Sequence, residues 1–210
     1  MLGGPSNQYY CLMQRGITRK CTVRGVDILL DVDSEDESGD VRNYEMWRVG
    51  HYADKEPDTL DWIDTHFKPG DTLFDIGANI GTHTVAFAKV VGEEGRVASF
   101  EPEPVTAGRL ERNIALNGLR NVTLMRCALG ERESGEMLYV DSRSGSGRHS
   151  LRPQDGWPAE EVRVLQGDAL VHSGALPTPN VMKIDVEGAE LGVIAGSKDA
   201  LADETCRLVF

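Results

Sequence analysis

The segment FDIGANIG, residues 74–81, is the feature that most limits the folds open to this chain. It continues an apolar run at residues 72–76 and precedes a stretch of helical spacing that extends to Val91 and stops at Gly92. A strand, a glycine-containing turn and a helix are therefore expected in succession. In an open sheet of parallel strands, ligands bind at the carboxyl ends of the strands, so this turn is the expected ligand site.

The alternation of strand and helix continues along the rest of the chain. Four more segments have the apolar character of strands, at residues 96–100, 121–126, 180–185 and 206–210. Helices are predicted from Asp58, over residues 105–117 and from near Glu187. Because parallel strands need a crossover of a dozen or more residues, we predict an α/β fold with a mostly parallel sheet and helices on both faces.

Residues 1–56 differ in character and are predicted to form a small β-containing leader before the main domain, residues 57–210. Two short strands are expected at residues 21–24 and 26–30. The acidic run that follows, residues 31–40, is typical of a solvated loop, because its spacing matches no calcium-binding loop.

The main domain also contains an irregular segment, residues 141–158, in which Ser and Gly alternate with Arg. This composition predicts a mobile loop, with possible strands on either side at residues 136–140 and 161–165. Its basic residues could meet an anionic or sugar-like substrate, although such loops are more often simply solvated.

Composition excludes some classes of protein. The 210 residues include 34 Asp and Glu against 22 Lys and Arg, and the net charge of −12 disfavours nucleic acid as the main partner. No apolar run reaches the roughly 18 residues of a membrane span, and no signal peptide is evident, so a cytoplasmic protein is expected. The four cysteines form no CxxC pair, which indicates reduced, mostly buried thiols rather than a zinc site or disulfides.

The glycine turn differs from that of dinucleotide-binding folds. Gly77 and Gly81 permit positive φ and close approach of a ligand, but the pattern is D-x-G-x-x-x-G and not the G-x-G-x-x-G that seats a pyrophosphate. Asp75, two residues before the first glycine, favours a ligand that lacks a phosphate and carries a cation or amine.

Glu101 ends the second strand of the domain, 20 residues beyond Gly81. A carboxylate at this place can accept hydrogen bonds from both hydroxyls of an adenosine ribose. The alternative is an exposed loop acid, which the spacing behind a glycine turn disfavours. By position alone, residues 126–129 at the end of the third strand could flank an adenine.

Five segments together resemble the signatures of FkbM-type S-adenosylmethionine-dependent methyltransferases: FDIGANIG, FEPEP, NIALN, CALG and KIDVEGAE, the last at residues 183–190. The resemblance covers roughly residues 56–210. It implies a Rossmann-like class I methyltransferase fold that uses S-adenosyl-L-methionine to methylate a hydroxyl of a sugar, polyketide or other small metabolite. The cofactor-binding residues expected on this basis are Asp75, Gly77, Asn79 and Gly81 for the methionine part, Glu101 for the ribose, and Cys127 and Ala128 for the adenine.

Asp185 and Glu187 follow the fourth strand and are expected beside the methyl donor. A hydroxyl acceptor must lose its proton, so these two carboxylates are the predicted catalytic groups, with His83 as a weaker third. Glu187 has an alternative role as a first-turn acid of the next helix. No third ligand accompanies the two acids, so no metal is expected. Lys183 shares a strand face with Asp185 and is expected to pair with Asp185 or Asp75 rather than act as a base.

Two other functions remain open. A nicotinamide-dependent oxidoreductase would share the arrangement but predicts G-x-G-x-x-G, which the sequence lacks. An inactive Rossmann-like binding module would leave Asp75, Glu101 and Asp185 solvated instead of convergent. The sheet of a class I methyltransferase has about seven strands, of which this chain supplies five core positions, so we expect its C-terminal strands to be missing.

Overall fold

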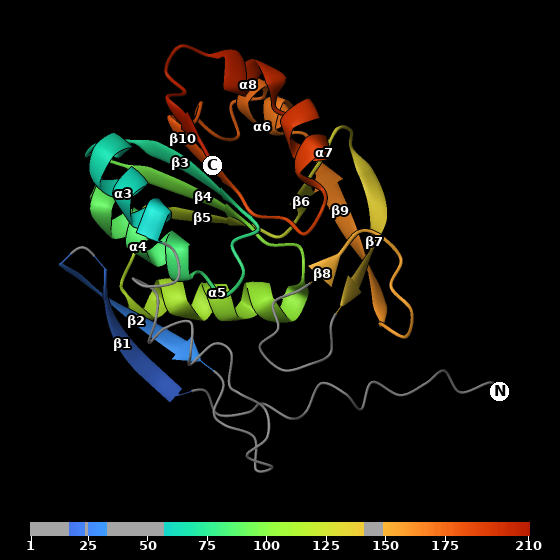
Figure 1. Ribbon diagram of the computed structural model, residues 1–210, viewed down its shortest axis with the longest axis horizontal. Helices are drawn as coiled ribbons and strands as arrows, with labels where there is room; N and C mark the ends of the chain where they lie inside the picture. The colour runs from blue at the N-terminus through green and yellow to red at the C-terminus, as the bar shows by residue number, and fades with distance from the viewer. Residues whose placement is uncertain (1–16, 24, 33–56, 141–148) are drawn as a thin grey trace.

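The computed structural model describes residues 17–23, 25–32, 57–140 and 149–210 (Figure 1). Its centre is a five-stranded sheet in which every neighbouring pair is parallel. The strand order is β11-β10-β3-β4-β5. The bounds are β3 (Thr72–Ile76), β4 (Arg96–Phe100), β5 (Val122–Met125), β10 (Val181–Ile184) and β11 (Leu208–Val209), which confirms the five strands predicted for the core.

Helices cover both faces of this sheet, as predicted, because its strands are apolar on both sides. Leu73 of β3 packs in a cluster with α3 (Pro57–His66) and α4 (Thr82–Val91), whereas Phe74 and Ile76 join a second cluster on the opposite face. Asp75 has the same side-chain parity as Leu73, so it faces α4. The remaining helices are α5 (Pro104–Leu116), α6 (Gly167–His172), α7 (Glu190–Ala195) and α8 (Lys198–Ala202).

A second sheet lies beside the carboxyl ends of the first (Figure 1). Its order is β6-β9-β7-β8, with β6 parallel to β9 and the other two pairs antiparallel. The bounds are β6 (Ala128–Leu129), β7 (Ser134–Val140), β8 (His149–Ser150) and β9 (Ala159–Leu165). The predicted strands at residues 136–140 and 161–165 are thus confirmed as β7 and β9. Residues 141–148 of the predicted loop lie outside the described residues, and its described remainder, residues 149–158, includes the short strand β8.

The predicted leader strands are β1 (Ile17–Val23) and β2 (Val26–Val32), which pair in antiparallel register. Alternate residues of β2 are buried in the core cluster that contains α4. Two asparagines of the NIALN segment hold β2 against α5: Asn113 Oδ1 accepts from Asp31 N at 2.6 Å, and Asn117 Oδ1 accepts from Leu29 N at 2.9 Å. The predicted boundary at residue 56 and the acidic run from residue 33 lie outside the described residues.

The helix expected from near Glu187 begins later, at Glu190. Gly188 has a φ of +88°, which is incompatible with a right-handed helix, and its N–H donates to Glu190 Oε1 at 3.0 Å. Glu187 therefore lies in a turn before α7, so its alternative role as a first-turn helix acid does not hold, whereas Glu190 is an acid of that first turn.

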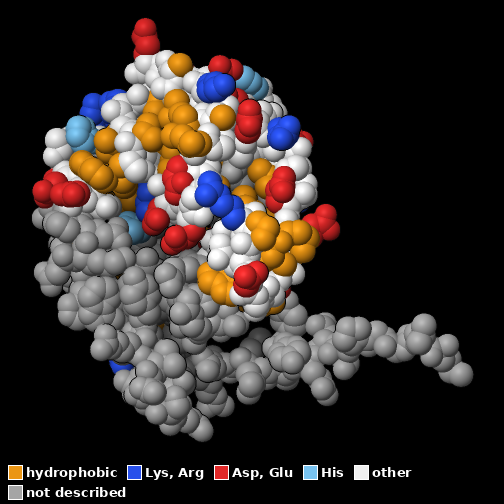
Figure 2. Space-filling model, turned by 45° about the vertical axis from the view of Figure 1, so that its right-hand side comes forward, with side chains coloured by type: hydrophobic (Ala, Val, Ile, Leu, Met, Phe, Trp, Pro, Cys, Tyr) orange, Lys and Arg blue, Asp and Glu red, His pale blue; other side chains and the backbone are white. Residues whose placement is uncertain are grey.

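On the face in Figure 2, acidic and basic side chains are interspersed, and the described residues form no continuous basic patch there. No helix in the described ranges is both long and apolar enough to span a bilayer. Cys127 is buried and Cys21 and Cys206 are half-buried; all three are free, and Cys11 lies outside the described residues.

Candidate active site

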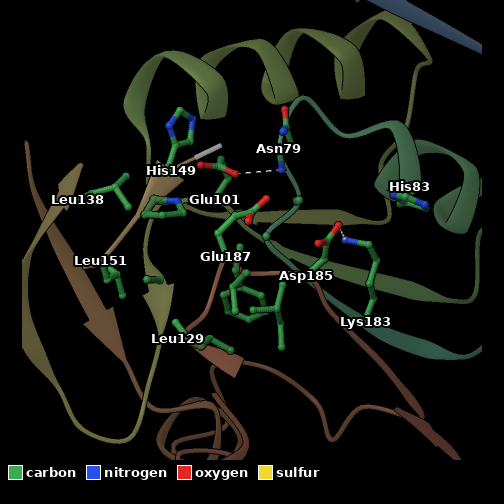
Figure 3. Close-up of a pocket in the computed structure, with 18 of the residues that line it drawn as sticks. Asn79, His83, Glu101, Leu129, Leu138, His149, Leu151, Lys183, Asp185 and Glu187 are labelled. Carbon is green, nitrogen blue, oxygen red and sulfur yellow. Dashed lines mark hydrogen bonds and ion pairs between the residues drawn. The ribbon is translucent and has the colours of Figure 1, made fainter. Parts of the chain in front are cut away.

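A pocket opens at the carboxyl ends of β3, β4 and β10 (Figure 3). The chain runs from β3 to β4 and β5 on one side of the sheet and later returns to β10 and β11 on the other, so the strand order reverses between β3 and β10. Such a reversal leaves a crevice between the diverging loops. The lining includes Gly77, Ala78, Asn79, Ile80, His83, Glu101, Pro102, Ala128, Leu129, Leu138, His149, Leu151, Lys183, Asp185 and Glu187.

The two glycines of the β3–α4 turn are required by packing within the protein. Gly77 has a φ of +78°, and a Cβ on it would lie 2.0 Å from the carbonyl oxygen of Asp185. Gly81 has a φ of +91°, and its Cβ would lie 2.2 Å from Leu110 Cδ1 of α5. Gly77 lines the pocket, whereas Gly81 does not. The close approach at Gly77 brings the loops after β3 and β10 together, and that at Gly81 brings the β3–α4 turn against α5.

Glu101 is held by the backbone of two turns. Its Oε2 accepts from Asn79 N at 2.9 Å and its Oε1 accepts from Glu103 N at 2.9 Å (Figure 3 draws the first of these). Asn79 has a φ of +53°, a conformation that Asn tolerates better than most residues and that turns its N–H toward the carboxylate. Glu101 is only 4% exposed. Each of its oxygens retains a lone pair that a ligand hydroxyl can use.

The environment of Glu101 disfavours its charged form when no ligand is present. Burial raises its pKa, the two backbone N–H groups lower it, and repulsion from Glu103 and Asp75 raises it further, which together brings the pKa of Glu101 to about 7. The second acid of FEPEP has another task, because Glu103 caps α5 by accepting from Val105 N and Thr106 N. Only Glu101 of the two lines the pocket.

Asp75 lies beneath the pocket and does not line it. Its side chain is fully buried; Oδ2 accepts from Thr84 Oγ1 at 2.5 Å, and Oδ1 lies 3.2 Å from Lys183 Nζ. The same Nζ lies 3.4 Å from Asp185 Oδ2. Lys183 thus pairs with both Asp75 and Asp185, the two partners expected from the sequence. Its ammonium compensates the negative charge of Asp75, which was expected to attract a ligand cation.

The three predicted catalytic side chains all line the pocket, but from different elements. Asp185 and Glu187 are exposed and follow β10, whereas His83 lies in the first turn of α4. In Figure 3, His83 is on the far side of Lys183 from Glu101. Its ring contacts that of Phe87, with the centroids 5.6 Å apart.

The predicted adenine residues are divided. Ala128 lines the pocket, but Cys127 is only 3% exposed and lies outside the lining, and burial raises the pKa of its thiol to about 11. Leu129, within the predicted segment 126–129, and His149, within the predicted loop, also line the pocket, whereas Leu138 of β7 and Leu151 after β8 were not predicted. Only one residue of β7, Leu138, is buried, so the strand lacks the alternation that would have indicated a buried face.

The described residues contain no group of three or more His, Cys, Asp or Glu side chains arranged to hold a metal ion. Asp185 and Glu187 follow the same strand, and the nearest charged contact of Asp185 in the structure is the ammonium of Lys183.

The sequence profile of the methyltransferase FkbM domain matches residues 75–210. A hexuronic acid methyltransferase, AglP of Haloferax volcanii, is 34% identical over 158 residues, which is 75% of this chain and 62% of that protein. The 31-O-demethyl-FK506 methyltransferase FkbM of Streptomyces tacrolimicus is 28% identical over 163 residues, covering 63% of this chain and 62% of its own length.

Among solved structures, that of methyltransferase FkbM from Methylobacillus flagellatus has a TM-score of 0.49 and 21% identity, covering 68% of this chain and 33% of that one. This chain spans less than two thirds of the length of the curated relatives named above. The profile match includes the β3–α4 turn, Glu101 and the segment after β10, which are the parts that build the pocket. The chain belongs to the FkbM methyltransferase domain family.

Proposed function

We propose that the protein transfers a methyl group from S-adenosylmethionine to a hydroxyl oxygen of a sugar or other small metabolite. The observation that carries the proposal is the carboxylate of Glu101, buried at the carboxyl end of β4 and fixed by Asn79 N and Glu103 N. A carboxylate with free lone pairs at this place suits the two hydroxyls of an adenosine ribose. Family membership supports the same activity.

The residues of the pocket fit an adenosyl ligand in a definite order. Glu101 would accept the ribose hydroxyls, and the turn at Gly77 and Asn79 would lie along the methionine part. Ala128, together with the apolar side chains of Leu129 and Leu138, would take the adenine. The turn between β3 and α4 has the pattern D-x-G-x-x-x-G and not the G-x-G-x-x-G that seats a pyrophosphate on a helix N-terminus, which favours an adenosyl compound over NAD.

When bound, the cofactor supplies an electrophilic methyl group, which the acceptor oxygen takes as the carbon–sulfur bond breaks and its electron pair stays on sulfur. The protein must hold the acceptor in line with that bond, because such a displacement depends mainly on geometry. It must also receive the hydroxyl proton. Asp185 is the group proposed for this step, with Glu187 next to it in the same turn, since both are exposed carboxylates on the pocket wall.

The cofactor is tested by calorimetry with S-adenosylmethionine, S-adenosylhomocysteine and NAD. We expect both adenosyl compounds to bind, Glu101→Ala to weaken binding, and Glu94→Ala, an exposed acid between α4 and β4, to leave it unchanged. Binding of NAD alone would support an oxidoreductase, and binding of none of the three would support an inactive module. Either result contradicts the proposal.

The acceptor is tested with a labelled methyl donor and a panel of hydroxyl compounds. Because one relative is named a hexuronic acid methyltransferase, D-glucuronic acid and related sugars come first in the panel. Incorporation of label into a hydroxyl is expected, and Asp185→Ala should lower turnover while the cofactor still binds. Label transferred only to nitrogen compounds would contradict the O-methyltransferase assignment.

A further inference from the structure

The KIDVEGAE segment contains a lysine, Lys183, that the proposed chemistry does not use. Its side chain is 6% exposed, yet it lines the pocket and carries a charge between two carboxylates. A buried ammonium is costly unless it is paired, so its presence at the pocket wall calls for an explanation.

Strand register explains how the three charges meet. Lys183 of β10 is directly opposite Asp75 of β3, so both side chains are on the face that packs against α4. Asp185 comes two residues after Lys183, and its side chain returns to the same face. The ammonium nitrogen lies 3.2 Å from Asp75 Oδ1 and 3.4 Å from Asp185 Oδ2 (Figure 3 shows the second pair).

The two carboxylates differ sharply in their freedom to move. The side chain of Asp75 is 0% exposed and is held by Thr84 Oγ1, which in turn contacts Ser99 Oγ at 3.0 Å. The side chain of Asp185 is 60% exposed. Asp75 is therefore the fixed end of the bridge, and Asp185 is the end whose rotamer depends on the bridge.

Lys183 is unsuited to take a proton itself. Burial disfavours the ammonium, but the carboxylates of Asp75 and Asp185 more than offset this and raise the pKa of Lys183 above its usual value. A lysine that stays protonated can orient a neighbouring carboxylate but cannot act as a base near neutral pH.

We propose that Lys183 is a positioning residue, which bridges the buried Asp75 to Asp185 and so fixes the Asp185 carboxylate at the pocket wall where the acceptor hydroxyl is deprotonated. This inference rests on the proposed methyl transfer. It assigns Asp75 a role through Lys183 instead of a contact with the cofactor.

The test removes the bridge without leaving an unpaired charge. Lys183→Met alone would strand the buried Asp75 carboxylate and destabilise the fold, so it is combined with Asp75→Asn, whose side chain can still accept from Thr84. Lys198→Met, at an exposed lysine of α8, is the matched control for the loss of a lysine. Thermal unfolding and binding of S-adenosylhomocysteine show whether the double variant is folded.

The first readout is the conformation of Asp185 in crystals of the wild-type and double-variant proteins, which requires neither cofactor nor acceptor. We expect one Asp185 rotamer in the wild type and several in the double variant. A single unchanged rotamer without Lys183 would overturn the proposal.

The second readout is methyl transfer to the acceptor identified with the labelled donor, with D-glucuronic acid as the first probe. The double variant should keep its affinity for S-adenosylhomocysteine but lose about tenfold or more in kcat. Added to Asp185→Asn, the same two changes should lower kcat no further, because Lys183 acts through Asp185.

If the double variant regained its kcat under conditions that restored its melting temperature, the bridge would be only structural and the proposal would be overturned. Failure of the wild-type protein to bind adenosyl compounds would instead overturn the proposed function. The crystallographic readout keeps these two failures distinguishable.

Discussion

The charge of Glu101 is the residue property that connects this site most directly to solution conditions. Its pKa of about 7 in the ligand-free protein means that it is partly protonated at neutral pH. Ribose hydroxyls donate to the charged form, so binding would lower this pKa and release a proton. Sequence spacing predicted the position of Glu101, but its burial and its two backbone donors depend on how the β3 and β4 turns meet.

We therefore expect cofactor binding to tighten as the pH rises through 7. With a free-protein pKa of about 7, the dissociation constant at pH 6 should exceed that at pH 8 by about tenfold. Calorimetry with S-adenosylhomocysteine in several buffers measures both the affinity and the proton released. Glu101→Gln cannot titrate, so its weaker binding should not vary with pH; a flat profile in the wild type would show that Glu101 does not contact the ligand.

A second prediction at this scale concerns Gly77, which the sequence singled out as a place of ligand approach. In the structure the obstacle to a side chain is the protein itself, since a Cβ would lie 2.0 Å from Asp185 O. Gly77→Ala should destabilise the fold by about 2–4 kcal/mol, because both the positive φ and the backbone clash oppose it. Denaturant unfolding measures this difference.

Gly118→Ala is the matched control, because Gly118 also has a positive φ, +64°, but a Cβ there has nothing within 4 Å. It should cost only about 1–2 kcal/mol, from the left-handed backbone alone. If the two variants lost the same free energy of unfolding, the backbone around Gly77 and Asp185 would shift to accommodate a Cβ without further destabilisation.

Secondary-structure elements were predicted well where a local pattern specifies them. The strands of the central sheet have short apolar runs, and the bounds of β3 and β4 match the prediction at both ends. The start of α7 was missed because Gly188 adopts a positive φ, which the acidic sequence around it does not indicate. The pairing of β6, β7, β8 and β9 into a separate sheet also has no local signal, since it is decided by tertiary contacts.

The attachment of β2 to α5 gives a prediction at the scale of elements. Asn113 is fully buried; its Nδ2 donates to Ile80 O at 2.8 Å while its Oδ1 accepts from Asp31 N. Asn113→Ala leaves both backbone groups without this partner, so a loss of about 1–3 kcal/mol is expected. Hydrogen exchange should quicken at the amides of Asp31 and Leu29 before the central strands are affected.

Asn121→Ala is the control for this measurement. Asn121 Nδ2 donates to Ala88 O and Gly92 O at the C-terminal end of α4, and neither acceptor is in β2. Its loss should therefore lower stability without faster exchange confined to β2. If β2 exchanged equally fast in both variants, the asparagine contacts would not be what holds the strand.

At the scale of the whole molecule, the pocket depends on two sheets that the chain forms from different segments. The central sheet contributes the polar groups, including Glu101 and Lys183, and the second sheet contributes apolar side chains such as Leu129 and Leu138 (Figures 1 and 3). The polar half could be predicted from motifs, because its residues are fixed by turns adjacent in sequence. Of the apolar half, Leu129 could be expected from its place at the end of the third strand, but Leu138 could not, because long-range pairing of β7 with β9 brings it to the pocket.

A ligand that fills this pocket should consequently stabilise both sheets together. We expect saturating S-adenosylhomocysteine to slow hydrogen exchange at the β3–α4 turn and also along β7 and β9, with a global gain of about 2.7 kcal/mol at a ligand concentration 100 times the dissociation constant. Leu138→Ala, on β7, should weaken binding and reduce the protection of β7 and β9, because Leu138 is only 3% exposed and lines the pocket. Met137→Ala is its control, since the neighbouring Met137 is 45% exposed and lies outside the lining. Protection confined to the β3–α4 turn and Glu101 would mean that the second sheet takes no part in binding, and the adenine would then have to lie against the central sheet alone.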